Sequence, residues 1–266
     1  MRRIRLVNYF RKEGKMNRVF DLARFWLLVK MELYRSKKGI IMTLVISFGI
    51  SFFLGLIMTP VFEPTLLVFQ HFDGYAFQLL ICGFILSSLT FNDLGNTLKR
   101  YQYLMLPAST FEKFMSMWLL TTVGWVVMYT TVFTAYTVFA NFIGGLIYSY
   151  LTYVPFDPFS EFSLATVRYY LVTQGIFMVG ATHFKGYVFP KTLISLIVFG
   201  MVLALIGYFI LYGLPDAGME QCVTEFEMLE GSALHTLWGM LVWMFWWVLA
   251  PLCWVISYFG LKEKEV

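Results

Sequence analysis

Six long apolar stretches follow one another along the chain, separated by short polar connections. The hydrocarbon core of a bilayer is about 30 Å thick, so a helix needs about 20 mostly apolar residues to cross it. The stretches that come close to or exceed this length are Gly39–Met58, Gly74–Phe91, Phe114–Ala140, Ser163–Phe184, Thr192–Gly213 and His235–Phe259. The pattern predicts an all-α polytopic membrane protein whose six transmembrane helices form one domain over residues 39–259.

A different pattern precedes the first predicted span. Between Asn17 and Lys38, charged residues gather on one helical side and apolar residues on the other. A seventh span is disfavoured, because Arg24 and Lys30 would each cost about 2.5–3.5 kcal/mol near the middle of a bilayer. We therefore expect an amphipathic interfacial helix, an elbow in the membrane surface, at the end of a cytoplasmic basic tail (residues 1–38). Residues 260–266 are expected to form a second cytoplasmic tail.

The basic residues alternate with the predicted spans and set their orientation. Twelve of the 20 Lys and Arg residues precede the first span, and seven more follow the second, fourth and sixth spans, which leaves Arg168 alone on the opposite face. Because loops rich in Lys and Arg stay in the cytoplasm, both termini are predicted to be cytoplasmic. The basic start of the chain, whether translation begins at Met1 or Met16, is expected to bind anionic lipids.

Composition narrows the class of protein further. Hydrophobic residues make up 59% of the chain and charged residues 14%, so no large soluble domain fits beside six spans. The net charge of +4 reflects the basic start and does not indicate a nucleic-acid partner. Three cysteines do not suggest a disulfide framework. The sequence holds no phosphate-binding glycine loop and three widely separated histidines, so no cofactor, metal site or ATP hydrolysis is predicted for this chain.

Four residues in or near the spans are candidates for a substrate path. Arg168 and Gln174 lie nearly two turns apart on the fourth predicted span, and Trp243 and Trp247 share one face of the sixth. Roles in packing are the alternative for all four. The predicted spans contain no Asp or Glu, so a relay driven by protons or sodium is not supported.

The connection between the second and third spans carries the most informative polar pattern. Leu94, Leu98 and Tyr101 recur at helical spacing, which predicts a short surface helix that Pro107 ends. The next four positions after Ala108, Ser109-Thr110-Phe111-Glu112, match a capping box that starts a new helix. Alone, this pattern predicts only a helix start.

Leu-Pro-Ala-Ser at residues 106–109, with Glu112-Lys113 and Met117-Trp118-Leu119-Leu120 after it, resembles the same loop of ABC-2 type transport permeases common in the Bacteroidetes. The resemblance implies a permease subunit, an exporter of the bacterial inner membrane, that pairs with a second permease copy and is driven by a separate ATP-binding subunit. The loop would be the coupling helix that docks on that subunit. Its contact residues would be Leu98, Lys99, Arg100, Leu106, Pro107, Ala108, Ser109 and Glu112.

Two other classes stay open from the sequence. A polytopic structural or assembly subunit of secretion, gliding or immunity machinery would have the same spans and move nothing. An enzyme acting on lipid would need a nucleophile and a base, and none stands out. The outer segments Phe142–Phe162 and Pro215–Gly231 do not align with a known substrate class. The role of the acidic segment Pro215–Gly231, the substrate and the identity of the second permease copy are therefore left open.

Overall fold

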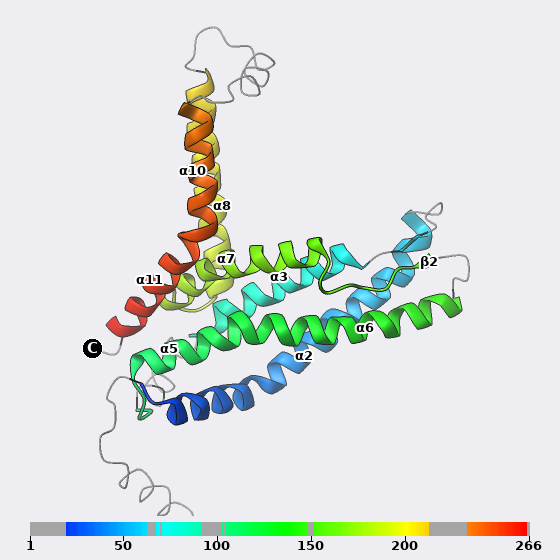
Figure 1. Cartoon of the computed structure of the whole chain (residues 1–266), viewed down its shortest axis with the longest axis horizontal. Helices are drawn as coiled ribbons and strands as arrows, with labels where there is room; N and C mark the ends of the chain where they lie inside the picture. Colours follow the sequence, from blue (N-terminus) through cyan, green and yellow to red (C-terminus); the bar gives the residue numbers. More distant parts are fainter. Residues whose placement is uncertain are drawn as a thin grey trace, which may run out of the picture.

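The computed structural model describes residues 20–62, 68–69, 71–91, 103, 105–147, 152–212 and 233–264. Within these ranges the regular secondary structure is helical apart from one pair of two-residue strands. The helices are α2 (Leu22–Phe62), α3 (Phe72–Leu89), α5 (Thr110–Leu119), the π-helix η2 (Leu120–Gly124), α6 (Trp125–Ile147), α7 (Glu161–His183), α8 (Val188–Tyr212), α10 (Ala233–Trp247) and α11 (Leu249–Glu263) (Figure 1). The predicted all-α class is confirmed, and each predicted span falls largely on one helix or on a continuous run of helices.

Four helical segments among the described residues are long and apolar enough to cross a membrane. They are Leu22–Phe53, Phe72–Leu89, Thr110–Ile147 and Val188–Phe209. A fifth arises if α10 and α11, which meet at a bend of 45°, form one broken span. α7, which carries the fourth predicted span, is not among them, because Gln174 and several hydroxyl-bearing residues interrupt its apolar sequence. The chain is thus a helical protein suited to a membrane, and the count of six spans stays a prediction.

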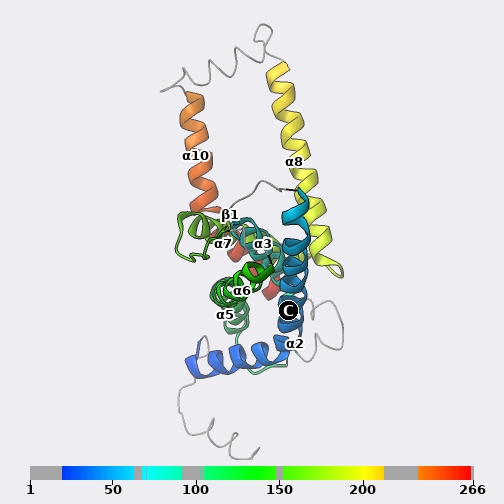
Figure 2. The same ribbon diagram turned by 90° about the vertical axis from the view of Figure 1, so that its right-hand side faces the viewer.

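The predicted elbow is not a separate helix. Residues Leu22–Lys38 form the first part of α2, which continues to Phe62 as one helix of 41 residues. Figures 1 and 2 show this first part inclined to the rest of α2. Its placement in a membrane surface stays a prediction.

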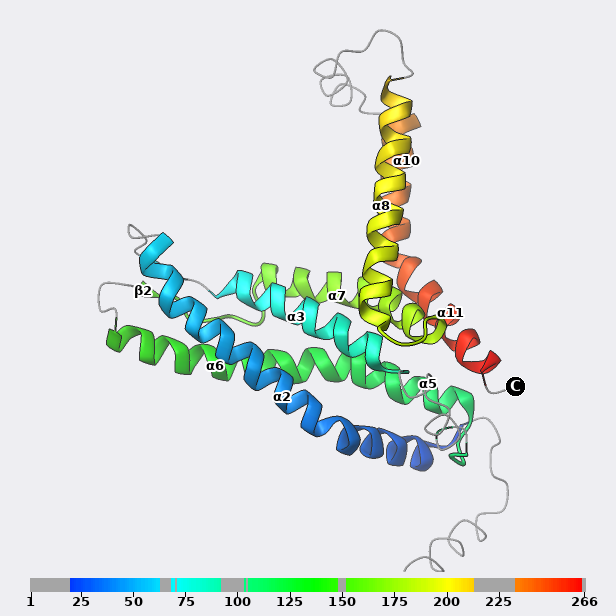
Figure 3. The same ribbon diagram turned by 180° about the vertical axis from the view of Figure 1, so that it is seen from behind.

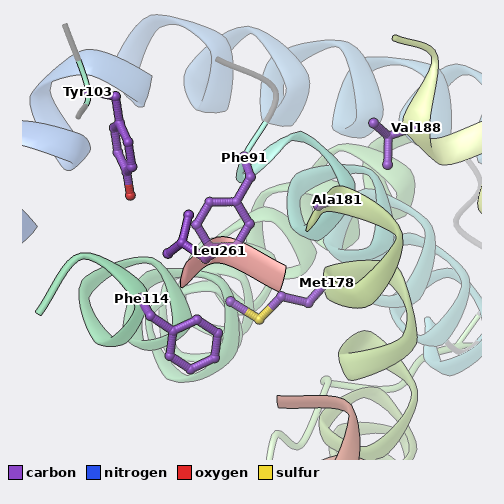
Figure 4. Packing of buried hydrophobic residues seen from close by; sticks show 7 residues of the cluster. All are labelled: Phe91, Tyr103, Phe114, Met178, Ala181, Val188 and Leu261. Carbon is purple, nitrogen blue, oxygen red and sulfur yellow. The ribbon is translucent and has the colours of Figure 1, made fainter. Parts of the chain in front are cut away.

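The packed part of the molecule is a bundle centred on α7, which lies between α3 and α11 (Figure 3). Gly83 lets α3 come close to α7, since a Cβ at this position would collide with the Tyr170 ring and lie 2.8 Å from Trp125 Nε1. Two clusters of buried hydrophobic side chains fill the bundle. The first contains Tyr75, Leu79, Trp125, Tyr129, Phe133, Phe156 and Tyr170. The second, shown in Figure 4, contains Phe91, Tyr103, Phe114, Met178, Ala181, Val188 and Leu261.

α8 and α10 leave this bundle and extend away from it, and Figure 2 shows them standing apart from each other. α8 departs from α7 through a tight turn in which Gly186 (φ 59°) and Tyr187 (φ 40°) both adopt left-handed backbone conformations. Of the most apolar stretch of α8, 6% is buried. Most of the side chains of this helix are therefore available to lipid or to another protein.

The two ends of the bundle are joined differently. At one end, β1 (Val68–Phe69) pairs in parallel with β2 (Thr152–Tyr153), so the segment before α3 meets the segment before α7. At the other end, the ring of Phe111 lies against Phe20 and against Tyr258, which brings together the starts of α2 and α5 and the last turns of α11. The beginning and the end of the described chain therefore lie at the same end of the bundle; which side of the membrane this end faces stays a prediction.

Candidate functional site at the starts of α2 and α5

The predicted capping box is present at the start of α5. Ser109 is extended (φ −69°, ψ 154°), and its hydroxyl oxygen accepts a hydrogen bond from the Glu112 backbone N–H at 3.2 Å. In return, Glu112 Oε2 accepts the Ser109 backbone N–H at 2.9 Å. Two backbone donors of the first turn are thus satisfied within the loop, which fixes where α5 begins.

The second oxygen of Glu112 reaches another helix. Glu112 Oε1 accepts the backbone N–H of Asp21 at 2.6 Å and a hydrogen bond from Arg24 Nη2 at 3.1 Å. Asp21 immediately precedes α2, and its own carboxylate accepts the Ala23 N–H at 2.9 Å. One carboxylate therefore holds the first turns of α2 and α5 together, where a negative charge is favoured by both helix dipoles.

This junction, which we define as Asp21, Arg24, Ser109 and Glu112, is shielded from solvent around Glu112, whereas the Asp21 side chain at its edge is 33% exposed. The side chain of Glu112 is fully buried, and that of Arg24 is 16% exposed. Removing one partner of a buried ion pair is strongly destabilising, because the remaining charge is left without compensation. The arrangement therefore ties two segments about ninety residues apart in sequence.

Aromatic and basic side chains surround the junction. Phe20 and Phe111 meet edge to face at 6.0 Å between ring centroids, and Phe114 meets Tyr258 of α11 at 5.8 Å. The ammonium group of Lys113 lies 5.5 Å from the centre of the Tyr103 ring, a cation–π distance. α11 and the segment before α5 are thereby included in the same packed unit.

The predicted coupling residues divide into those that the structure describes and those that lie outside its described residues. Ser109 and Glu112 lie in the junction, and Leu106, Pro107 and Ala108 form the turn before it, in which the Ala108 N–H donates to the Leu106 carbonyl at 2.8 Å. Leu98, Lys99 and Arg100 lie outside the described residues. The sequence places Asp21 and Arg24 on the charged side of a predicted helix, but no pattern in it links them to the loop.

Gln174 occupies a buried polar contact inside the bundle. Its Nε2 donates to Thr122 Oγ1 at 3.0 Å, and its Oε1 accepts a hydrogen bond from Ser87 Oγ at 3.4 Å. Nearby, Tyr170 donates to the Thr121 backbone carbonyl at 2.6 Å. Thr121 and Thr122 belong to η2, whose widened turns leave backbone carbonyls in reach of side chains from other helices.

The other three candidates for the substrate path lie at the surface. Arg168 is exposed on α7, and Trp243 and Trp247 of α10 are 59% and 69% exposed. A cavity of about 800 Å³ lies between α2, α3 and the α5–η2–α6 run, and its described lining includes none of these three residues and not Gln174. The structure therefore does not bring the four candidates together, and a path through them stays a prediction.

At the far end of the bundle, His71 precedes α3. Its Nε2 donates a hydrogen bond to Asn141 Oδ1 at 2.7 Å. Burial lowers the pKa of His71 below its ordinary value, and the hydrogen bond to Asn141 raises it by a smaller amount. His71 therefore favours the neutral form at neutral pH and adds no positive charge to this end.

The described residues include no group of three or more His, Cys, Asp or Glu side chains that could hold a metal ion. The chain matches no family model, and neither a curated protein nor a solved structure is similar to it. What the junction can do is mechanical: it fixes one loop to the starts of two long helices.

Proposed function

We propose that the chain is the permease subunit of an ABC-2 type exporter in a bacterial inner membrane, with six spans and both termini in the cytoplasm. The resemblance of the loop to such permeases and the apolar helices support this proposal. The observation that carries it is the junction at Glu112, where the loop that resembles a coupling helix is bonded to the amphipathic start of α2.

A coupling loop must transmit its own displacement to the membrane helices. A loop that moved independently of these helices would transmit none. Here α5 continues through η2 into α6, and Glu112 joins its start to α2. A force applied to the segment before α5 would therefore reach the first and third predicted spans together. Switching of this kind requires elements that move as rigid bodies between two arrangements.

The proposal assigns ATP hydrolysis to a separate ATP-binding subunit and substrate export to a pair of permease copies. The start of α2 would lie in the inner membrane surface as an elbow, where its basic residues meet anionic lipids. The chain itself would need no cofactor.

The test is ATP hydrolysis by the chain co-purified in lipid discs with a P-loop ATP-binding subunit, sought first among the genes that neighbour its own. Glu112→Gln is expected to lower hydrolysis about tenfold or more, because it breaks the buried pair with Arg24. The ATP-binding subunit should still co-purify. Glu263→Gln, at an exposed position at the end of α11, is the matched control and should hydrolyse ATP as the wild type does.

A second variant separates docking from transmission. Reversing the charge of Lys99 and Arg100 to Glu should reduce the amount of ATP-binding subunit that co-purifies, and the difference from the wild type should shrink at high salt, because salt screens an exposed charge contact. If no ATP-binding subunit co-purifies with the wild-type chain, or if Glu112→Gln hydrolyses ATP normally, the permease proposal fails. The alternative of a structural or assembly subunit then stands.

A further inference from the structure

α11 lies along the second half of α7 at a constant offset in sequence. A Cβ at Gly175 would lie 3.0 Å from the Cβ of Cys253, and a Cβ at Gly260 would lie 3.1 Å from the hydroxyl oxygen of Thr182. In both pairs the residue of α11 follows its partner on α7 by 78 positions. The two helices therefore run parallel, and this offset predicts which residues would meet if the contact continued toward the start of α7.

The same face of α7 is uncovered in its first half. The positions 7, 11 and 14 residues before Gly175 fall on nearly the same side of the helix, since 3.6 residues complete a turn. They are Arg168, Leu164 and Glu161, which we call the α7 strip, and all three are exposed. Among the described residues, Arg168 has no ion-pair partner. Because a charged residue in a membrane helix faces other helices or water, the α7 strip calls for a covering element.

α10 carries residues that match the α7 strip. The offset of 78 positions places Gly239, Val242 and Trp246 opposite it. Gly239 and Val242 are exposed, and the ring of Trp246 already lies 4.8 Å from that of Tyr169 on α7. A glycine lets two membrane helices approach closely, and the face of an indole ring attracts a guanidinium group. The offset thus sets one apolar side chain against another and an indole ring against the arginine.

A single break in the chain keeps α10 off the strip. α10 and α11 meet at a bend of 45° at Val248, whose φ of −102° departs from the α-helical value of about −63°. Pro251 has no backbone N–H, so the carbonyl of Trp247 lacks its helical donor. The bonds around Val248 are intact: its N–H donates to the Met244 carbonyl at 2.9 Å, and its carbonyl accepts the Leu252 N–H at 3.0 Å. The bend therefore rests on one residue and one missing hydrogen bond.

The bend leaves neither helix long enough to cross a bilayer alone. α10 and α11 have 15 residues each, about 22 Å, whereas the hydrocarbon core is about 30 Å thick. Taken together, the helical stretch from Gly239 to Glu263 is long and apolar enough to cross. A straight α10–α11 helix would therefore have the length that a span requires.

We propose that α10 and α11 straighten into one span in the membrane, and that α10 then docks on the α7 strip with Trp246 over Arg168. Val248 is the hinge between this closed arrangement and the open one, in which α10 is inclined away from α7 (Figure 1). Closing places the guanidinium group of Arg168 between two helices. The proposal requires only a membrane, and it depends neither on an ATP-binding subunit nor on transport.

The experiment is disulfide formation in the full chain in lipid discs, with the linked peptides identified by mass spectrometry. The test pair is Glu161→Cys with Gly239→Cys, which lie opposite each other in the closed arrangement. Gly239 lies eight residues before Trp247, about 12 Å along the axis, so the 45° bend moves it about 8 Å further from α7. A disulfide needs Cα atoms within about 7 Å, so the pair links only in the closed arrangement.

Glu161→Cys with Leu241→Cys is the matched control. Leu241 is exposed like Gly239 but lies on the opposite side of α10, two residues along the helix. The test pair should link about tenfold faster than this control or more, because only its Cα atoms come within disulfide distance. Circular dichroism and the unfolding midpoint of each double variant, compared with the wild type, show that the chain is folded.

Single changes added to the test pair examine the contact and the hinge separately. Arg168→Gln removes the cation–π contact and should slow linking about threefold. Arg168→Lys keeps a cation and should slow linking less. Pro251→Leu, at an exposed position, returns a backbone donor to the carbonyl of Trp247 and should speed linking, because the straight helix gains a hydrogen bond.

Three results would overturn the proposal. They are linking of the test pair no faster than that of the control pair, unchanged linking after Arg168→Gln, and unchanged or slower linking after Pro251→Leu. Because no ATP-binding subunit takes part in the experiment, failure here leaves the proposed function untouched.

Discussion

α7 and α8 are neighbours in the sequence and have opposite surroundings. Of the 23 residues of α7, 11 are buried, and they include Ser163, Tyr170 and Gln174. α8 has the highest hydropathy of the four spanning candidates, yet 6% of its most apolar stretch is buried. In this chain, therefore, the helix at the centre is the more polar one. Hydropathy reports which helix meets lipid, and it does not identify the helix that organises the bundle.

The physical reason is that polar groups in a membrane protein need partners, and other helices supply them. Gln174 and Tyr170 bond to η2 and α3. Small residues allow the close approach that these bonds require: a Cβ at Gly175 would lie 3.0 Å from the Cβ of Cys253. α8 has neither feature along most of its length, and so it is suited to a lipid surface.

The largest difference in the free energy of unfolding between α7 and α8 variants is expected when a phenylalanine is replaced by alanine. Phe177 of α7 is 3% exposed and stacks on Phe84 at 4.3 Å between centroids, whereas Phe199 of α8 is 61% exposed. Phe177→Ala should lower the free energy of unfolding by about 3–5 kcal/mol. Phe199→Ala should change it by about 0.5 kcal/mol or less. Denaturation in mixed micelles, followed by circular dichroism, measures both, and equal losses would show that α8 is packed.

Glycine-to-alanine substitutions should give a smaller difference in the free energy of unfolding between α7 and α8. A Cβ at Gly180 would collide with Thr192, whose hydroxyl is fixed by a bond to the Val188 carbonyl at 3.0 Å. Gly180→Ala should therefore cost about 1–3 kcal/mol in the same unfolding measurement. Gly200→Ala has open space and should stabilise α8 by up to about 1 kcal/mol, the difference in helix propensity. The comparison is wrong if both changes have the same sign.

The smallest loss of stability is expected when the buried hydrogen bonds of Gln174 are removed. Gln174→Leu removes the bonds to Ser87 and Thr122 and should cost about 1 kcal/mol, typical of hydrogen bonds between membrane helices. Ser195→Leu, at an exposed position on α8, is the control and should be close to neutral. If Gln174→Leu instead leaves stability unchanged but alters transport by the assembled complex, Gln174 belongs to a substrate path.

Local features of this fold were accessible from the sequence. The helical class and the capping box of Ser109 and Glu112 follow from short-range patterns, and the structure contains both. The contact from Glu112 to Asp21 was not accessible, because it joins residues 91 positions apart and no periodicity records it. The sequence left packing and a substrate path open for Gln174, because a polar residue in an apolar run looks alike whether it faces a substrate or a neighbouring helix.

The parallel pairing of β1 with β2 has a consequence for how the chain is made. β1 ends at Phe69 and its partner ends at Tyr153, so the pair cannot form until synthesis has passed α6. A ribosome delivers helices to the membrane in order. The end of the bundle at which α2 leads into α3 is therefore incomplete until α6 and β2 have followed. This end of the bundle can therefore be completed only after the chain has been synthesised as far as Tyr153.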